Sequence, residues 1–191
     1  CINSINPIDN EFNAMSGGGR MVPFDDNHIL FSIGEYLNRY LAQDIESDNG
    51  KIIKVNINNY DYEIISIGHR NPQGLYFDDE NNFILSTEHG PKGGDEINLI
   101  EVDQINTNKI LNYGWPISSY GEHYVDNQEK YKKYPLHKSH SEYGFIEPLT
   151  YFTPSIGISE IVKIRKNKYV ASSLKYKSLY FFEIDNKKNI I

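Results

Sequence analysis

The chain has 191 residues, enough for a domain with a hydrophobic core, with 39% hydrophobic residues and a formal net charge of −7. This negative charge argues against nucleic-acid binding, because phosphate contacts need clustered Lys and Arg side chains. One dense basic group, interleaved with Tyr and His, is interpreted as a solvated loop: Lys130, Lys132, Lys133 and Lys138. The sequence contains no apolar run of about 18 residues and therefore predicts no membrane-spanning helix.

Strand-forming residues dominate the composition. The chain has 15 Tyr and 9 Phe, and aromatic and β-branched residues suit strands better than helices. No long stretch keeps a helical apolar period, so we expect an all-β fold. The single cysteine, Cys1, excludes an internal disulfide and a metal site built from cysteines. Attachment of a lipid to this N-terminal cysteine stays open as an alternative.

A hairpin pattern recurs along the chain. The segment FDDNHILFS at 24–32 returns as FDDENNFILS at 77–86, and a weaker copy, IVKIRKNKYVASS, spans 161–173. Each copy is typical of a strand end, a polar turn and a second strand. One more alternating strand follows each hairpin, at 51–56, 96–102 and 178–184.

Repeated antiparallel units of this length predict the blades of a β-propeller. The first two copies start 53 residues apart, and the third follows a long insertion over about 103–153. A β-sandwich with accidental similarity between its hairpins is the alternative. Because propellers typically need four to eight blades, we expect a partial propeller of about three blades. Half a ring leaves apolar blade faces uncovered, so we also expect self-association of this chain.

The segment GHRNPQGL at 68–75 is predicted to form a loop at the mouth of the propeller, directly before a hairpin. Pro72 restricts Asn71 to extended conformations, and Gly74 permits a turn. Arg70 offers a rigid fork of donors that suits a carboxylate or quinone oxygen. A polar turn that caps a blade is the alternative interpretation.

The segment EHGPKGGDEINL at 88–99 combines three glycines with a proline. Such a loop exposes carbonyl oxygens, and Asp95 and Glu96 follow it closely. Hard oxygen donors of this kind suit Ca²⁺, although the spacing is not that of an EF-hand. The segment lacks the GK[ST] of a phosphate-binding loop. A Gly-rich hairpin held by local hydrogen bonds remains the alternative.

Together, the two segments and the hairpin between them closely resemble the central motif of the soluble aldose sugar dehydrogenases of the glucose/sorbosone dehydrogenase family. Members of that family are six-bladed propellers that use pyrroloquinoline quinone (PQQ) and Ca²⁺. Further matching motifs lie at 19–20, 33–35, 42–44, 50–51, 112–116, 120–124, 152–156 and 173–175. The resemblance implies that residues 1–191 belong to one such propeller domain, truncated at both ends, with about three blades of four antiparallel strands each.

The resemblance also implies roles for individual residues in cofactor binding. Arg70 and Asn71 would contact PQQ, with Arg70 near the quinone oxygens. Ser155 and Lys175 would bind the carboxylates of the cofactor. Trp115, within the NYGWP motif at 112–116, is expected to pack in a core and not to act as a ligand.

For the metal, the resemblance implies that the backbone carbonyl oxygens of Gly90 and Pro91 hold the Ca²⁺ that polarises the quinone. Asp95 and Glu96 match an acidic pair that serves loop structure or a second Ca²⁺ in relatives.

The sequence departs from the family at the position of the catalytic base. Relatives have a His three residues before a Gly-Arg pair, and here that position holds Ser16, followed nineteen residues later by Glu35 in place of an orienting Asp. A neutral Ser is a poor base. A shifted register, His28 or His69 could compensate, but we expect Glu35 to serve, because desolvation raises the pKa of a carboxyl group toward neutrality.

These features predict an oxidoreductase that converts aldose sugars to lactones and passes the electrons to an acceptor, in the periplasm or outside the cell. The alternative is a catalytically degenerate propeller that binds a sugar or a protein partner. Formation of a homodimer by the full-length protein stays open.

Overall fold

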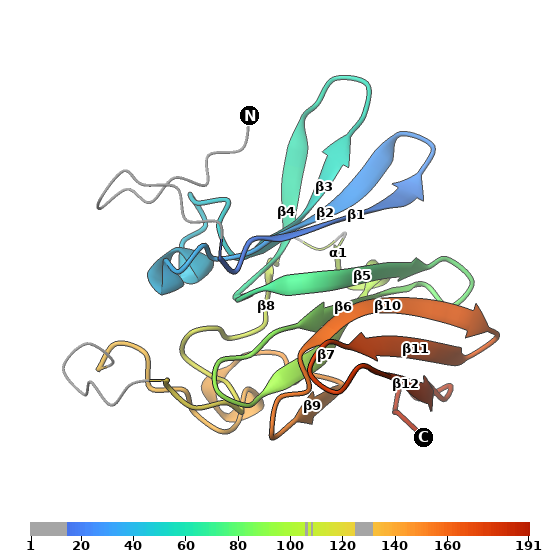
Figure 1. Ribbon diagram of the computed structural model, residues 1–191. Coiled ribbons are helices and arrows are strands. Elements are labelled where there is room, and N and C mark those ends of the chain that lie inside the picture. The colour runs from blue at the N-terminus through green and yellow to red at the C-terminus, as the bar shows by residue number, and fades with distance from the viewer. Residues whose placement is uncertain (1–14, 106, 108, 125–131) are drawn as a thin grey trace.

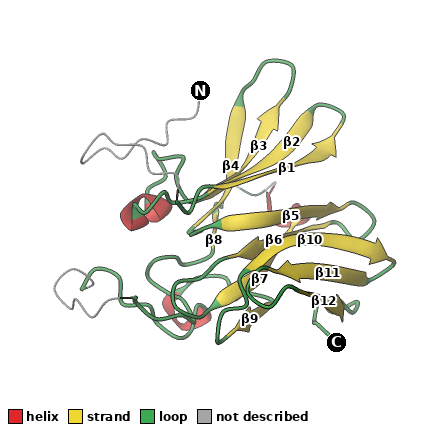
Figure 2. Ribbon diagram, in the orientation of Figure 1, coloured by secondary structure: helices red, strands yellow, loops and turns green. Residues whose placement is uncertain are grey.

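The computed structural model describes residues 15–105, 107, 109–124 and 132–191 (Figure 1). The predictions for Cys1 and Lys130 fall outside these residues. Within the described part, the helical segments are short: η1 (Arg39–Gln43), α1 (Val102–Ile105) and η2 (Ser141–Tyr143). None of them has the length and apolar character needed to cross a membrane. The prediction of an all-β fold is confirmed (Figure 2).

The strands form three sheets that follow one another along the chain. The first contains β1 (Gly18–Asp25), β2 (His28–Ile33), β3 (Lys51–Asn56) and β4 (Tyr62–Ile67), with the short β8 (Leu111–Asn112) parallel to β4. The second contains β5 (Pro72–Asp78), β6 (Phe83–Glu88), β7 (Asp95–Glu101) and β9 (Thr150–Phe152). The third contains β10 (Ile158–Arg165), β11 (Lys168–Ser173) and β12 (Ser178–Glu183).

The first strands of the three sheets lie side by side, with β5 packed between β1 and β10 (Figure 1). Each of these strands pairs with the next in an antiparallel hairpin, as the repeat predicts. All three hairpins also have a register shift near the start of the first strand. Such irregularities increase the local twist and bend the strand. The repeat therefore corresponds to blades of a partial propeller, which confirms the predicted fold, although the third sheet has three strands among the described residues where four were expected.

One boundary differs from the prediction. Residues 72–75 were expected in a loop, but β5 already begins at Pro72. Proline is tolerated there because it opens the strand, where an N–H is not required by the ladder. The loop that carries Arg70 and Asn71 is therefore short and tightly held between β4 and β5.

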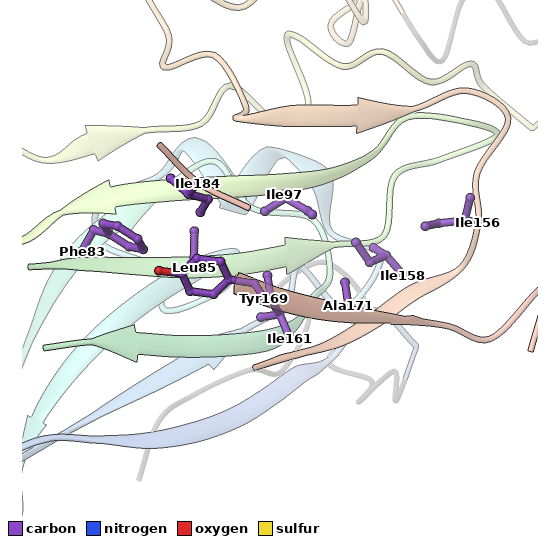
Figure 3. Packing of buried hydrophobic residues seen from close by; sticks show 9 residues of the cluster. All are labelled: Phe83, Leu85, Ile97, Ile156, Ile158, Ile161, Tyr169, Ala171 and Ile184. Carbon is purple, nitrogen blue, oxygen red and sulfur yellow. The ribbon is translucent and has the colours of Figure 1, made fainter. Parts of the chain in front are cut away.

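The hydrophobic core lies between neighbouring blades. One cluster joins the second and third sheets (Figure 3): Phe83, Leu85, Ile97, Ile156, Ile158, Ile161, Tyr169, Ala171 and Ile184. A second cluster joins the first and second sheets: Leu30, Ile52, Ile65, Leu75, Ile84, Ile100, Leu111 and Tyr113. Adjacent residues of β6 point into different clusters, since side chains alternate along a strand. This explains why the whole of β6 is buried.

The outer face of the third sheet is exposed. Val162, Val170 and Phe181 are neighbours across its strands and share that face. Phe181 is 69% exposed and Leu179 is 58% exposed. An uncovered apolar sheet face of this kind is unusual for a soluble monomer.

Candidate cofactor and metal site

Arg70 stands in the short loop between β4 and β5 and contacts the loop that follows β6. Its Nη1 donates hydrogen bonds to the carbonyl oxygens of His89 (2.9 Å) and Gly90 (2.8 Å). Its backbone N–H donates to the carboxylate of Glu88. The buried Nε has no hydrogen-bond partner among the described residues. The guanidinium group is thus fixed in place and still has donor capacity for an anionic ligand.

The loop after β6 depends on glycine. A Cβ at Gly90 would lie 2.1 Å from the carbonyl oxygen of Gly94, so no other residue fits without moving the backbone. Gly93 and Gly94 have φ angles of 87° and 68°, in the left-handed region that favours glycine. This sequence therefore specifies a compact turn that presents its carbonyl oxygens next to Arg70.

A continuous series of hydrogen bonds leads from this turn to the third sheet. The hydroxyl of Ser155 donates to the carbonyl oxygen of Pro91 at 3.4 Å, and Lys175 Nζ donates to the carbonyl oxygen of Ser155 at 3.0 Å. Together with the bond from Arg70 to Gly90, these contacts bring five predicted site residues into one hydrogen-bonded group. They come from segments up to about a hundred residues apart in the chain.

Asn71 connects the first two blades at the same place. Its side-chain oxygen accepts the backbone N–H of Gly18 at 3.0 Å, and its carbonyl oxygen accepts the N–H of His89 at 3.1 Å. The side chain is almost completely buried. Asn71 therefore lies beside Arg70 and also holds the start of β1, two residues after Ser16.

Ser16 and Glu35 lie next to each other. The carbonyl oxygen of Ser16 accepts the backbone N–H of Tyr36 at 3.2 Å, and that of Gly17 accepts the N–H of Gly34 at 2.9 Å. A Cβ at Gly34 would lie 1.8 Å from the Ser16 carbonyl oxygen, which makes glycine necessary there. The two positions expected to replace the family's His and Asp are thus adjacent in space.

The carboxyl group of Glu35 is only 1% exposed, and its Oε2 has no hydrogen-bond partner among the described residues. Burial raises the pKa of Glu35 to about 7, although the nearby charges of Arg70 and Arg39 and the Trp115 indole act to lower it. Arg39 and Arg70 both stack on Trp115, 5.1 and 5.5 Å from the ring centroid. Trp115 is itself buried against Ala42 and Leu136, as the sequence predicts.

Neither of the other two histidines proposed as a base has a suitable environment. His69 is fully buried, and its ring nitrogens are bound to Glu88 Oε2 (3.0 Å) and Ser66 Oγ (2.8 Å). His28 is the first residue of β2, and its side chain pairs with Asp25 at 2.8 Å. The structure thus gives Glu35 the better position beside Arg70.

The acidic pair after the Gly-rich turn has two different environments. Both carboxylate oxygens of Asp95 accept backbone N–H groups, from Gly90 on one side and from residues 156–158 on the other. Of its two expected roles, loop structure is the one that these bonds serve. Glu96 is buried, and desolvation and the charge of Glu88 raise its pKa well above the usual value.

Sequence reasoning missed the polar cluster beneath this turn. Asn98 Nδ2 donates to Glu88 Oε2 (3.4 Å) and to Glu96 Oε2 (3.3 Å), and Glu96 Oε1 lies 3.5 Å from Nε2 of the buried His140. Glu88 could have been found from its place at the head of the EHGP motif, but His140 lies far away in the insertion. In the described part of the chain, no three acidic or histidine side chains form a metal-binding group. The Ca²⁺ ligands expected beside the quinone are instead backbone atoms, the carbonyl oxygens of Gly90 and Pro91.

Comparisons with known proteins indicate one family for this chain. The family model described as "Glucose / Sorbosone dehydrogenase" matches residues 8–191. The chain is 33% identical over 165 residues to the uncharacterized protein slr1608 of Synechocystis, covering 74% of this chain and 37% of that protein. It is 30% identical over 165 residues to the aldose sugar dehydrogenase YliI of Escherichia coli, covering 80% of this chain and 41% of that protein.

Solved structures show the same fold. The apo-form of the soluble aldose sugar dehydrogenase from Escherichia coli superposes with a TM-score of 0.73 at 26% identity, over 91% of this chain and 52% of that one. The PQQ-bound aldose sugar dehydrogenase from Streptomyces coelicolor superposes with a TM-score of 0.65 at 24% identity, over 91% of this chain and 46% of that one. The chain spans less than half the length of these curated relatives and about half of these solved chains. With its family model matched over nearly all residues, the chain belongs to the glucose/sorbosone dehydrogenase family.

Proposed function

We propose that the protein is an oxidoreductase that oxidises aldose sugars at the anomeric carbon to lactones, with PQQ as cofactor and Ca²⁺ bound beside it. The observation that carries this proposal is the hydrogen-bonded group of Arg70, Gly90, Pro91, Ser155 and Lys175. It brings two cationic side chains, Arg70 and Lys175, together with the carbonyl oxygens of Gly90 and Pro91, on segments that come from neighbouring blades. Names of relatives, which include a quinoprotein glucose dehydrogenase, support the same chemistry.

The residues present fit such a cofactor. PQQ carries three carboxylates and an ortho-quinone, so its site needs charged donors. The buried Nε of Arg70 has no hydrogen-bond partner in the part of the chain that the structure describes, and Lys175 is exposed at the opposite end of the group. Carbonyl oxygens, here those of Gly90 and Pro91, are hard ligands that suit Ca²⁺. When bound, PQQ would supply the two-electron acceptor and Ca²⁺ the Lewis acid that makes it more electrophilic.

The remaining task for the protein is to remove the proton from the anomeric hydroxyl group of the sugar. Ser16 cannot do this efficiently, because its hydroxyl has no pKa near neutrality. The Glu35 carboxyl has a pKa of about 7 and lies beside Ser16 and Arg70, so it is about half ionised at neutral pH. We assign the role of base to Glu35, and the loss of the family's His should make oxidation slower than in relatives.

A second function is favoured by one observation: Ser16 stands at the position of the family's catalytic His. A propeller that retains the cofactor scaffold without turnover would act as a sugar- or partner-binding module. In either case, we propose a periplasmic or secreted location, an aldose sugar as ligand and, for the enzyme, an external electron acceptor. A homodimer of the full-length protein belongs to the same proposal.

The deciding experiment uses the full-length protein. Titration of its apo-form with PQQ and Ca²⁺ should change the absorbance of the quinone, and dye-coupled oxidation of glucose should then be measurable. Quinone binding without turnover would favour the binding module over the enzyme. Absence of any spectral change would reject the cofactor assignment.

A further inference from the structure

Lys51, the first residue of β3, is completely buried. Its Nζ donates three hydrogen bonds, all to backbone carbonyl oxygens: those of Leu41 (2.9 Å), Ala42 (3.2 Å) and Asn49 (2.6 Å). It makes no salt bridge within the part of the chain that the structure describes. The ammonium group thus uses all three of its donors on the segment between β2 and β3.

Burial of this group is costly. Desolvation lowers the pKa of Lys51 to about 8, although the charges of Asp44 and Asp48 act to raise it. Buried lysines are rare, because an ammonium group loses its hydration on burial and the site must compensate for that loss. A Met side chain of similar length would fill the space without that cost. Charged side chains that are buried against this general preference tend to lie at functional sites, so the contacts of Lys51 should show a functional reason for its burial.

The contacts of Lys51 lead to Glu35 in two steps. The carbonyl oxygen of Asn49 accepts a hydrogen bond from Lys51 Nζ. The side-chain amide of the same buried residue, Asn49, donates to the carbonyl oxygen of Glu35 at 3.2 Å. The next residue, Gly50, donates its N–H to the carbonyl oxygen of Gly34 at 2.9 Å. The carbonyl oxygens of Gly34 and Glu35 are therefore both held by the segment that Lys51 organises.

The other side of Glu35 is held from the second blade. Its backbone N–H donates to the carbonyl oxygen of Arg70 at 2.8 Å. Oε2 of Glu35 has no hydrogen-bond partner among the described residues, so the backbone contacts contribute to the position of its carboxylate. A small shift of a catalytic group reduces the rate strongly, because proton transfer requires hydrogen-bond reach.

We propose that Lys51 is a positioning residue for Glu35: its buried ammonium group fixes Asn49 and the η1 segment, which in turn fix the Glu35 backbone and aim its carboxylate. This inference rests on the proposed function for the role of Glu35 as a base. It extends that function to a residue that contacts neither sugar nor cofactor.

The same strand offers a matched control. Lys54 lies three residues along β3, and its ammonium group pairs with Glu63 across the antiparallel β3–β4 ladder. Lys54→Met removes a lysine from the same strand without touching the Asn49 contacts. Asn49→Ala keeps the Lys51 ammonium and removes only the donor to Glu35, so it tests the connection if Lys51→Met does not fold.

The kinetic test uses the full-length holoenzyme. Lys51→Met and Asn49→Ala should each lower kcat by tenfold or more, with KM and quinone affinity changed less than twofold, whereas Lys54→Met should leave kcat unchanged. In a Glu35→Gln background, Lys51→Met should cause no further loss, because the group that it positions is already gone. An equal loss in that background, or an equal effect of Lys54→Met, would overturn the inference.

A second readout does not depend on turnover. Carbon-13 NMR of the glutamate carboxyl groups measures the pKa of Glu35, whose signal is identified by its absence in Glu35→Gln. This pKa depends on the nearby charges of Arg70, Arg39 and Glu88. Lys51→Met and Asn49→Ala should each move this pKa by about half a unit or more. An unchanged Glu35 titration in both variants refutes the positioning role even if sugar oxidation is never observed. A shifted titration without any oxidation would instead count against the proposed enzyme.

Discussion

The backbone N–H of Glu35 donates a 2.8 Å hydrogen bond to the carbonyl oxygen of Arg70. Glu35 follows the last strand of the first hairpin, and Arg70 lies in the loop that opens the second blade. This one bond places a carboxyl group with a pKa near 7 next to the arginine proposed to face the quinone. The chemistry therefore depends on the junction between two blades and not on either blade alone.

Arg70 should be essential for cofactor affinity. Arg70→Ala leaves an anionic group of the cofactor without its charged partner, which typically costs about 1.5–3 kcal/mol, or roughly 10- to 100-fold in Kd. Quinone titration of the full-length apoprotein measures this change. Arg165→Ala, at the last residue of β10, is the matched control. Equal affinities for Arg70→Ala and the wild type would reject this role of Arg70 without rejecting the cofactor.

Restoration of the family's base should accelerate oxidation. Ser16→His adds an imidazole beside Glu35, and general-base catalysis is typically worth about 10²–10⁴-fold. We expect a higher rate of dye-coupled glucose oxidation for Ser16→His and an unchanged rate for the control Ser16→Ala. Glu35→Gln should lower the residual activity of the wild type by about 10²-fold or more, to a rate that is still measurable. A fast wild type that retains full activity after Glu35→Gln would disprove both assignments.

Glu35 should also make stability depend on pH. Its folded pKa of about 7 lies above the usual 4.5, so the folded state binds the proton more tightly than the unfolded state does. The associated stability is fully present below pH 4.5 and is lost as the pH rises to about 7. At pH 8 the loss amounts to about 3 kcal/mol. Glu35→Gln should therefore stabilise the protein at pH 8 and have little effect at pH 4.5, as urea unfolding at the two pH values would show.

Gly90 should be required for Ca²⁺ dependence. A side chain at Gly90 would collide with the Gly94 carbonyl, so Gly90→Val must displace the carbonyl oxygens proposed as ligands. The affinity for Ca²⁺, measured by titration after chelation, should fall by at least tenfold. Gly144→Asn is the control, because no atom lies within 4 Å of its added Cβ and Asn tolerates the left-handed conformation. Similar Ca²⁺ affinities for the two variants would contradict the proposed ligands.

The 191-residue chain should self-associate through the outer face of its third sheet. Leu179 and Phe181 are both more than half exposed there. Sedimentation velocity should show oligomers whose fraction falls when both residues are replaced by Lys, because charge opposes apolar association. Tyr60→Lys, at a turn residue that is 79% exposed, should change nothing. A monomeric wild-type chain at high concentration would contradict this expectation.

Much of the fold follows from local sequence patterns. Alternating apolar residues and polar turns specify the hairpins, and their recurrence predicts the blades before any contact is known. The motif at 88–99 likewise predicts a turn, because its glycines permit left-handed backbone angles and its proline fixes φ. These features depend on neighbours in the chain, which explains why the prediction succeeded for them.

Other features depend on residues that are distant in sequence. No local pattern shows that Asp95 would bind the amides of residues 156–158, or that His140 would lie beside Glu96. The pKa of Glu35 and the burial of Lys51 are likewise set by several segments that exclude water together. The sequence by itself determined the blades, the loops and the residue types at the site. Only the tertiary structure decided which of those groups are desolvated, which are paired and which remain free to bind, because desolvation and pairing arise where separate blades meet.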